Sequence, residues 1–269
     1  GHREKMRVIN KEHLLEPLNR AALRIARKCA DNPPKSLGVS LMAGNISNSN
    51  IWEVNNPKIQ TQVKNMFAEM VKWAKEEKAD FIIGETFYYA EEAFAALEEI
   101  KKSGLPSVIT ISPMGENKMR DGYTILETCK KLEELGADVV GLNCFRGPKM
   151  TMKLLPEIRK AVSCHVAALP VPYRTTEKDP GFLNQTDEGC DCIPGGNAFP
   201  VALDNLYCNR FEMAEFAKDC VQNKINFIGI CCGAEAHHVR EMSVAIGKKP
   251  ISMKYMPDMS KHFHLGTDR

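Results

Sequence analysis

The sequence predicts an α/β protein with a parallel sheet, because amphipathic helical stretches alternate with short apolar runs along nearly the whole chain. The apolar runs are continuous rather than alternating, which is typical of strands that are buried on both faces. We expect six strands in one domain over residues 1–246, followed by a tail over 247–269. An open doubly wound sheet and a barrel both agree with this element order.

The first elements are bounded by recognisable stop and start residues. Apolar residues recur at three- and four-residue steps over 11–30, and Asp31 followed by Asn32, Pro33 and Pro34 ends this predicted helix. The apolar run 37–42 is the first predicted strand. Pro57 then stands where proline is favoured, in the first turn of a helix.

The remaining elements repeat this alternation. We expect strands at 80–85, 108–112, 138–144, 165–169 and 226–231, and helices at about 90–103, 125–135, 151–162, 211–222 and 235–246. The segment 171–209 is rich in Pro, Gly, Asn, Asp and Cys, so it is predicted to be mostly loop.

Composition narrows the class of protein. With 43% hydrophobic and 26% charged residues in 269, the chain has the composition of a globular protein rather than a disordered one. Its 36 basic and 34 acidic side chains give a net charge of +2, so electrostatics provide no reason to expect nucleic acid or a membrane as partner. Neither a long apolar segment nor a signal peptide is evident, so we expect a cytoplasmic protein.

Polar side chains stand at the ends of three predicted strands. They are Glu85, the pair Asn143 and Cys144, and the pair Cys231 and Cys232. Active sites of parallel α/β folds form at the carboxyl ends of strands, so the three thiols can converge there on one metal ion. Three protein ligands on Zn²⁺ leave a fourth position open, which is the pattern of a catalytic rather than a structural site.

Other interpretations of these residues stay open at this point. The three cysteines can instead fill the core, because free cysteine is among the most buried residue types. A rival metal set is Cys190, Cys192 and Cys208, although its Cys-x-Cys spacing is looser than that of usual zinc motifs. Glu85 can be a substrate contact or a loop-facing carboxylate.

Aromatic and histidine side chains near the strand ends have two interpretations as well. Phe87, Tyr88 and Tyr89 can surround a cationic ligand, with at least one of them packing against a helix. His237 and His238 follow the last strand, where a capping or solvated role is expected rather than metal ligation.

Two motifs resemble those of the zinc-dependent homocysteine S-methyltransferase family. They are Gly141-Leu-Asn-Cys144 and Gly229-Ile-Cys-Cys-Gly233, each at a predicted strand end. The stretches 16–22, 81–85 and 257–261 are most similar to the betaine–homocysteine branch. The resemblance covers nearly the whole chain and implies a (β/α)8 TIM-type barrel. Because members begin with about two further β/α units, it also implies that the first two units are absent from this chain.

The resemblance assigns roles to individual residues. It implies that Cys144, Cys231 and Cys232 ligate zinc and that Glu85 contacts the amino group of homocysteine. Asn143 matches the asparagine before the first ligand. Thr86 and Phe87 follow Glu85 in the substrate-binding stretch, and Thr86 stands where the betaine branch has tyrosine. At the last strand, the mild departure is Ile230 in place of glycine.

The function implied by the resemblance is methyl transfer from an onium donor to L-homocysteine, giving methionine, with Zn²⁺ as cofactor. The donor is glycine betaine or a sulfonium such as dimethylsulfoniopropionate or S-methylmethionine, and Arg146 or Arg174 is a candidate for holding its carboxylate. The alternatives are a homocysteine-binding module of a larger cobalamin-type methyltransferase, a zinc-binding protein without catalysis and a different barrel enzyme. Assembly into a homo-oligomer is compatible with each of these interpretations.

Overall fold

The computed structural model describes residues 1–35, 38–115, 117–186 and 196–267. Within these ranges six strands form one sheet, in the order in which they occur along the chain, and every neighbouring pair is parallel. The strands are β1 Ala43–Ser47, β2 Phe81–Phe87, β3 Ser107–Ile111, β4 Val139–Asn143, β5 His165–Leu169 and β6 Phe227–Ile228. The predicted parallel α/β architecture is therefore confirmed.

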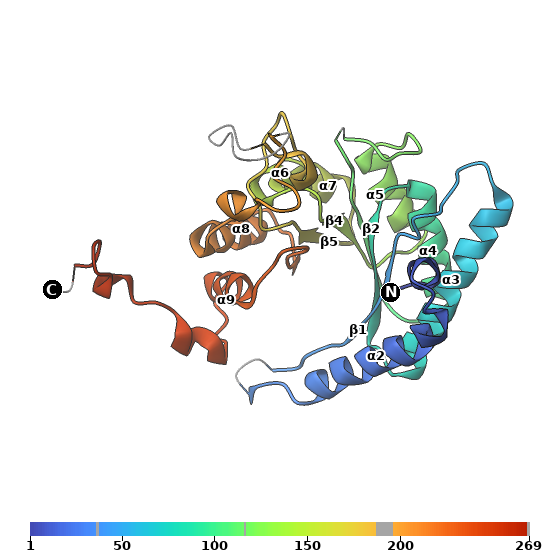
Figure 1. The fold of residues 1–269 in the computed structure, drawn as a ribbon, viewed down its shortest axis with the longest axis horizontal. Helices are drawn as coiled ribbons and strands as arrows, with labels where there is room; N and C mark the ends of the chain where they lie inside the picture. Colours follow the sequence, from blue (N-terminus) through green and yellow to red (C-terminus); the bar gives the residue numbers. More distant parts are fainter. Residues whose placement is uncertain (36–37, 116, 187–195, 268–269) are drawn as a thin grey trace.

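Helices connect the strands and lie outside the curved sheet (Figure 1). They are α1 Arg3–Val8, α2 Leu15–Asp31, α3 Pro57–Glu76, α4 Ala90–Ser103, α5 Ile125–Glu134, α6 Pro148–Met152, α7 Leu155–Ala161, α8 Arg210–Gln222 and α9 Ala236–Ala245. Capping explains several starts: the side chains of Asn56, Thr124 and Asn209 accept backbone N–H groups at the first turns of α3, α5 and α8.

The first predicted strand is wrong in its position. The chain over 38–42 forms no strand, and β1 begins at Ala43, one residue after the predicted strand ends. Val39 and Leu41, which suggested a buried strand, are 87% and 64% exposed. The true strand carries few large side chains because it passes close to a helix: a Cβ atom on Gly44 would lie 2.5 Å from the Cβ of Ala74.

Two further boundaries differ from the prediction. The helix expected over 151–162 is divided into α6 and α7, because Pro156 stands in the first turn of α7 and starts a new helix there. The last strand is shorter than expected, and only Phe227 and Ile228 pair with β5. Residues 229–231 lie outside the strand, although the N–H groups of Gly229 and Cys231 still donate to the carbonyls of Ala168 and Pro170.

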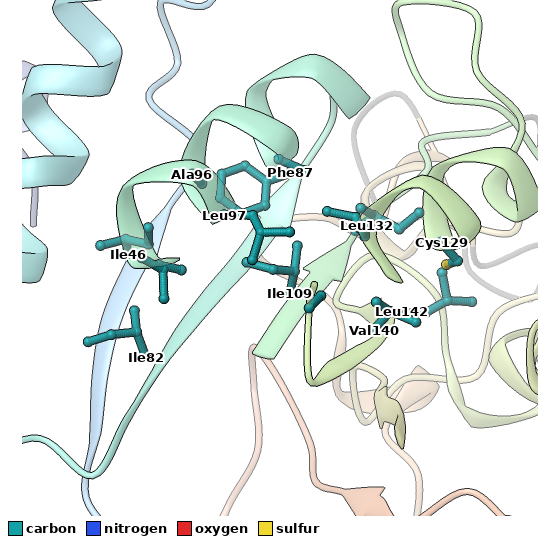
Figure 2. Close-up of a cluster of buried hydrophobic side chains, with 14 of the residues drawn as sticks. Ile46, Ile82, Phe87, Ala96, Leu97, Ile109, Cys129, Leu132, Val140 and Leu142 are labelled. Carbon is teal, nitrogen blue, oxygen red and sulfur yellow. The ribbon is translucent and has the colours of Figure 1, made fainter. Parts of the chain in front are cut away.

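The main hydrophobic core lies between the sheet and the helices that cover it (Figure 2). The strands contribute Ile46, Ile82, Ile109, Val140 and Leu142, which meet Ala96 and Leu97 of α4 and Cys129 and Leu132 of α5. Cys129 is fully buried in this core. Core packing is therefore the role of at least this cysteine.

The sheet is barrel-like but not closed among the described residues. Strand β1 pairs only with β2, and β6 pairs only with β5. On the inner face, Phe81, Ile83, Leu169 and Phe227 are only partly buried. Closure into an eight-stranded barrel by two further β/α units stays a prediction. The tail after α9 forms two short 3₁₀ turns, Ile251–Tyr255 and Met259–Lys261, and extends away from the sheet (Figure 1).

In the part of the chain that the structure describes, no helix combines the length and the apolar composition needed to cross a bilayer. Because all six strands run in parallel, the segments that follow β2, β3, β4, β5 and β6 meet at one end of the sheet. This end carries the polar residues that the sequence placed at strand termini.

Candidate metal centre and active site

Three thiols converge at the carboxyl end of the sheet. The sulfur atoms of Cys144, Cys231 and Cys232 all lie within 4.8 Å of one another, and no other group of this kind occurs among the described residues. The Sγ–Sγ distances to Cys232 are 3.6 Å from Cys144 and 3.8 Å from Cys231. Cys144 and Cys231 are half-buried and Cys232 is exposed, so one side of the cluster faces outward.

Strand β5 holds the two cysteine segments together. The backbone N–H of Cys144 donates to the carbonyl of Leu169 at 2.9 Å, and that of Cys231 donates to the carbonyl of Pro170 at 2.8 Å. Consecutive residues at the end of β5 therefore fix the segments that follow β4 and β6. Cys144 and Cys231 are 87 residues apart in sequence and meet because their strands flank β5.

The backbone at the site adopts conformations that most residues avoid. Cys144 and Phe145 have φ values of 56° and 55°, and Thr86 at the end of β2 has φ 62°. For residues other than glycine this left-handed region costs roughly 1–2 kcal/mol each. Strain of this kind persists where surrounding contacts over-determine it, which is typical of functional sites.

The donor set matches the chemistry of a zinc site. Zinc accepts three thiolates and keeps a fourth position for another ligand. Without an ion, hydrogen bonds from Cys144 and Cys231 lower the pKa of Cys232, while bonding to Cys231 and Cys232 raises the pKa of Cys144. Of the rival cysteines, Cys208 is buried and does not belong to this cluster, and Cys190 and Cys192 lie outside the described residues.

A polar network borders the thiols. The side-chain amide of Asn143 donates to Thr86 Oγ1 at 2.7 Å and lies 3.4 Å from Glu85 Oε2 and 3.8 Å from Cys231 Sγ. Asn45 Nδ2, on β1, donates to Glu85 Oε1 at 2.6 Å. The carboxyl group is therefore held from both sides, and burial raises its pKa while the bond from Asn45 opposes that rise. An anionic group beside the thiols suits a cationic substrate group.

These geometries agree with the comparisons with known proteins. The profile described as homocysteine S-methyltransferase matches residues 2–246. The chain belongs to the homocysteine S-methyltransferase family. Its relatives include the betaine–homocysteine S-methyltransferase 1 of Bos taurus, 30% identical over 236 residues, with 85% of this chain and 53% of that protein covered.

A second relative in the family is the S-methylmethionine–homocysteine S-methyltransferase BHMT2 of Pongo abelii, which is 27% identical to this chain. The aligned region covers 87% of this chain and 61% of that protein. The chain thus spans between about half and three-fifths of these curated relatives. Among solved structures, the metallated homocysteine methyltransferase MmuM from Escherichia coli has a TM-score of 0.61 at 14% identity, with 85% of this chain and 70% of that chain covered. This likeness supports the shared fold.

The structure distributes the aromatic candidates between core and site. Phe87 is fully buried and packs edge-on against Phe67, with ring centroids 6.0 Å apart. This placement gives Phe87 a packing role and does not support contact with substrate. Tyr88 lies near the thiols instead: burial raises its pKa, and negative charge on Cys144 raises it further.

The two arginines expected to hold a carboxylate are already engaged. Arg174 forms an ion pair with Glu212 at 2.7 Å in a groove that the three thiols do not line. Arg146 is buried and donates to the carbonyl of Gly115 at 2.8 Å. His238 caps α9, because its Nδ1 accepts the Glu235 N–H at 3.1 Å, as expected from its position after the last strand.

Three residues of the site were missed from sequence alone. Asn45 was hidden because the first strand was placed too early. Tyr173 follows β5 and approaches the second motif so closely that a Cβ atom on Gly233 would lie 2.3 Å from its hydroxyl. Arg120 lies in the segment after β3, 5.1 Å from the ring centroid of Tyr88. Only Asn45 had a feature in the sequence that could have marked it as a site residue, because it is a polar residue within a strand. Tyr173 and Arg120 lie in the segments after strands and had no such feature.

Proposed function

We propose that the full-length protein transfers a methyl group from an onium donor to the thiol of L-homocysteine, giving methionine, and that Cys144, Cys231 and Cys232 hold Zn²⁺ for this reaction. The convergence of these three sulfurs within 4.8 Å carries the proposal. Family membership supports it, since the names of the relatives above pair homocysteine with betaine or S-methylmethionine.

Each part of the site has a distinct task in this proposal. The three thiolates bind the ion, and zinc, when bound, makes a substrate thiol more acidic while it stays nucleophilic. Glu85 accepts hydrogen bonds from the ammonium group of homocysteine. Asn45 and Asn143 orient the Glu85 carboxyl group, which lies 2.6 Å and 3.4 Å from their amide nitrogens.

The methyl transfer itself needs no general acid. The thiol loses its proton to solvent, and a sulfur lone pair forms the new S–CH₃ bond as the bond between methyl and the onium atom breaks. The electron pair of the broken bond stays on the leaving nitrogen or sulfur, which becomes a neutral amine or thioether. The chain's main contribution is to hold sulfur and methyl in line, and such orientation supplies about 7–11 kcal/mol in well-aligned reactions.

Zinc content and methionine formation test the proposal together. We expect about one zinc per chain in the parent protein, and loss of both zinc and methionine formation in Cys144→Ala, Cys231→Ala and Cys232→Ala. Cys29→Ala is the matched control, because Cys29 is an exposed cysteine on α2, outside the cluster. Glycine betaine, dimethylsulfoniopropionate and S-methylmethionine are the donors to assay.

Three results would contradict the proposal. Zinc bound without methionine formation from any donor would indicate a zinc protein without this activity. A requirement for cobalamin would indicate a homocysteine-binding module of a larger methyltransferase. Absence of zinc in full-length protein with free thiols would remove the metal site itself.

A further inference from the structure

A guanidinium group covers an aromatic ring at the carboxyl end of the sheet. The Cζ atom of Arg120 lies 5.1 Å from the ring centroid of Tyr88 and 5.9 Å from that of Tyr89. The backbone N–H of Arg120 also donates to the carbonyl of Tyr88 at 2.9 Å. Backbone and side chain together therefore fix the segment after β3 against the segment after β2.

Tyr88 follows directly after β2, at the end of the sheet that carries the three thiols. The residue is partly buried. Burial raises the pKa of its hydroxyl, charge on Cys144 raises it further, and Arg120 opposes that rise. The segments that carry the three groups all follow parallel strands, so they meet at the same end of the sheet. Arg120 is thus placed against an aromatic ring at the end of the sheet that carries the cluster.

Arg120 has no carboxylate partner among the described residues. Its side chain contacts the two rings and Met114, whose Sδ lies 3.1 Å from a guanidinium nitrogen. The adjacent Asp121 is used elsewhere, because its two oxygens accept the N–H groups of Ala90 and Glu91 at 3.0 and 2.9 Å. The guanidinium is also exposed, so an anion from solution can reach it.

From this arrangement we infer that Arg120 binds the carboxylate of the methyl donor and selects onium carboxylates of zero net charge, an inference that rests on the proposed methyl transfer. A planar guanidinium stacked on a ring is already oriented for bidentate binding of a carboxylate. With the carboxylate at Arg120, the onium end of a short zwitterion points along Tyr88 toward the thiols.

The positive charge of Arg120 also favours some candidate donors over others. Glycine betaine and dimethylsulfoniopropionate each carry one positive and one negative charge. S-methylmethionine carries an additional ammonium group and a net positive charge, which the guanidinium repels. Arg120 therefore favours the first two donors over the third.

Three variants of the zinc-reconstituted full-length protein test this inference. Arg120→Ala removes the guanidinium, and Arg120→Lys keeps the charge without the planar fork. Lys118→Ala is the matched control, since it removes one exposed cation from the same segment without a contact to Tyr88. The substrates are glycine betaine and its methyl ester, and the unreactive probe is tert-butylacetate, in which carbon replaces the onium nitrogen.

In Arg120→Ala we expect the KM for glycine betaine to rise by roughly ten- to a hundredfold, the range for a lost hydrogen bond to a charged group. The KM for homocysteine should change little, and the KM for the methyl ester, which carries a net positive charge, should not rise. The KM of Arg120→Lys for glycine betaine should fall between those of the parent and the alanine variant. Calorimetric titration with tert-butylacetate should show the same loss of affinity in Arg120→Ala. Lys118→Ala should match the parent in every measurement.

An equal rise in KM for betaine and for its ester would overturn the inference, because the ester has no carboxylate. Unchanged tert-butylacetate affinity in Arg120→Ala, or an equal loss in Lys118→Ala, would overturn it as well. If the parent protein forms no methionine from any donor, the proposed function fails, and the tert-butylacetate titration still decides whether Arg120 binds a carboxylate here.

Discussion

The side chain of Asn143 is bonded to Thr86 at both ends of its amide group. Its oxygen accepts the backbone N–H of Thr86 at 2.9 Å, and its nitrogen donates to Thr86 Oγ1 at 2.7 Å. Thr86 has φ 62°, a conformation that a β-branched residue rarely adopts. Asn143 therefore holds the irregular end of β2 in a strained conformation, and its amide nitrogen also lies 3.4 Å from Oε2 of the adjacent Glu85.

Removing this clamp should destabilise the protein and displace Glu85. Asn143 is 1% exposed, so Asn143→Ala leaves a partly buried N–H without its acceptor, and we expect a loss of about 1–3 kcal/mol in the free energy of unfolding. Thr86→Val keeps the branched shape and the N–H bond but removes the hydroxyl, so its loss should be smaller. Denaturant unfolding of the metal-free proteins measures both, and equal losses would show that the N–H bond contributes nothing.

Asn45 should affect homocysteine binding rather than the chemical step. It donates to Glu85 Oε1 at 2.6 Å, so Asn45→Ala frees the carboxyl group to rotate, and Asn45→Asp places a second carboxylate beside it. We expect the KM for homocysteine to rise in both variants, more in Asn45→Asp, with a smaller change in kcat. Steady-state kinetics with Asn32→Ala as a surface control checks this. A fall in kcat at unchanged KM would assign Asn45 a different role.

The order of elements was predictable because each is encoded locally. Pro57 starts α3, Gly104 ends α4 in the left-handed conformation with φ 78°, and apolar residues line the faces that became buried. The first strand was misplaced because its environment is not local. Ala43–Ser47 is a strand because Gly44 allows close contact with α3, and no periodicity within five residues reveals that contact.

The site was only partly predictable for a similar reason. The predictable residues stand near the carboxyl ends of strands, and parallel topology brings these ends together; they are Cys144, Cys231, Cys232, Asn143 and Glu85. The left-handed turns at Thr86 and Cys144 and the position of Arg120 depend on contacts between segments distant in sequence. Phe87 looked like a site residue from its neighbours, yet the turn at Thr86 directs it into the core instead.

The first glycines of the two motifs should differ in their tolerance of a methyl group. A Cβ atom on Gly141 would lie 2.1 Å from the carbonyl oxygen of Ala167, which is backbone of the adjacent strand. A Cβ atom on Gly229 would meet Leu169 Cδ2 at 2.4 Å, the end of a side chain that can rotate away. Overpacking costs typically about 1–3 kcal/mol. We expect the loss of stability in Gly141→Ala to reach or exceed the upper end of this range. The loss in Gly229→Ala should stay near the lower end.

Zinc content should follow the same order. Gly141→Ala separates β4 from β5 and so weakens the bond between Cys144 N–H and Leu169 that positions the first thiol. Thermal unfolding and metal analysis of the two variants provide the comparison. If Gly229→Ala were the more damaging change, close packing between β4 and β5 would not be the reason for glycine in the first motif.

Two glutamates on α4 should give opposite pH dependences of stability. Glu92 is 1% exposed, and burial raises its pKa even though Ser49 donates to it through both N–H and Oγ. Glu98 is solvent-accessible, and its bonds to Lys64 and Lys102 lower its pKa. The folded state therefore binds a proton more tightly than the unfolded chain at Glu92 and less tightly at Glu98.

Linkage gives the sign of each effect. The contribution of Glu92 to stability is largest below the ordinary glutamate pKa of 4.5 and declines as pH rises from there toward its raised value. The contribution of Glu98 is present above 4.5 and is lost as pH falls through its lowered value. Denaturant unfolding of parent, Glu92→Gln and Glu98→Gln between pH ~3 and ~7 measures both differences.

With rising pH, the stability of the parent should decrease relative to Glu92→Gln and increase relative to Glu98→Gln. Because both substitutions are isosteric and lie on the same helix, changes in the rest of the protein cancel between the two comparisons. A pH-independent difference for Glu92→Gln would show that the Ser49 hydrogen bonds fully compensate the cost of burying this charge. The buried Glu92–Ser49 contact would then stabilise the segment after β1 equally well at every pH at which the protein folds.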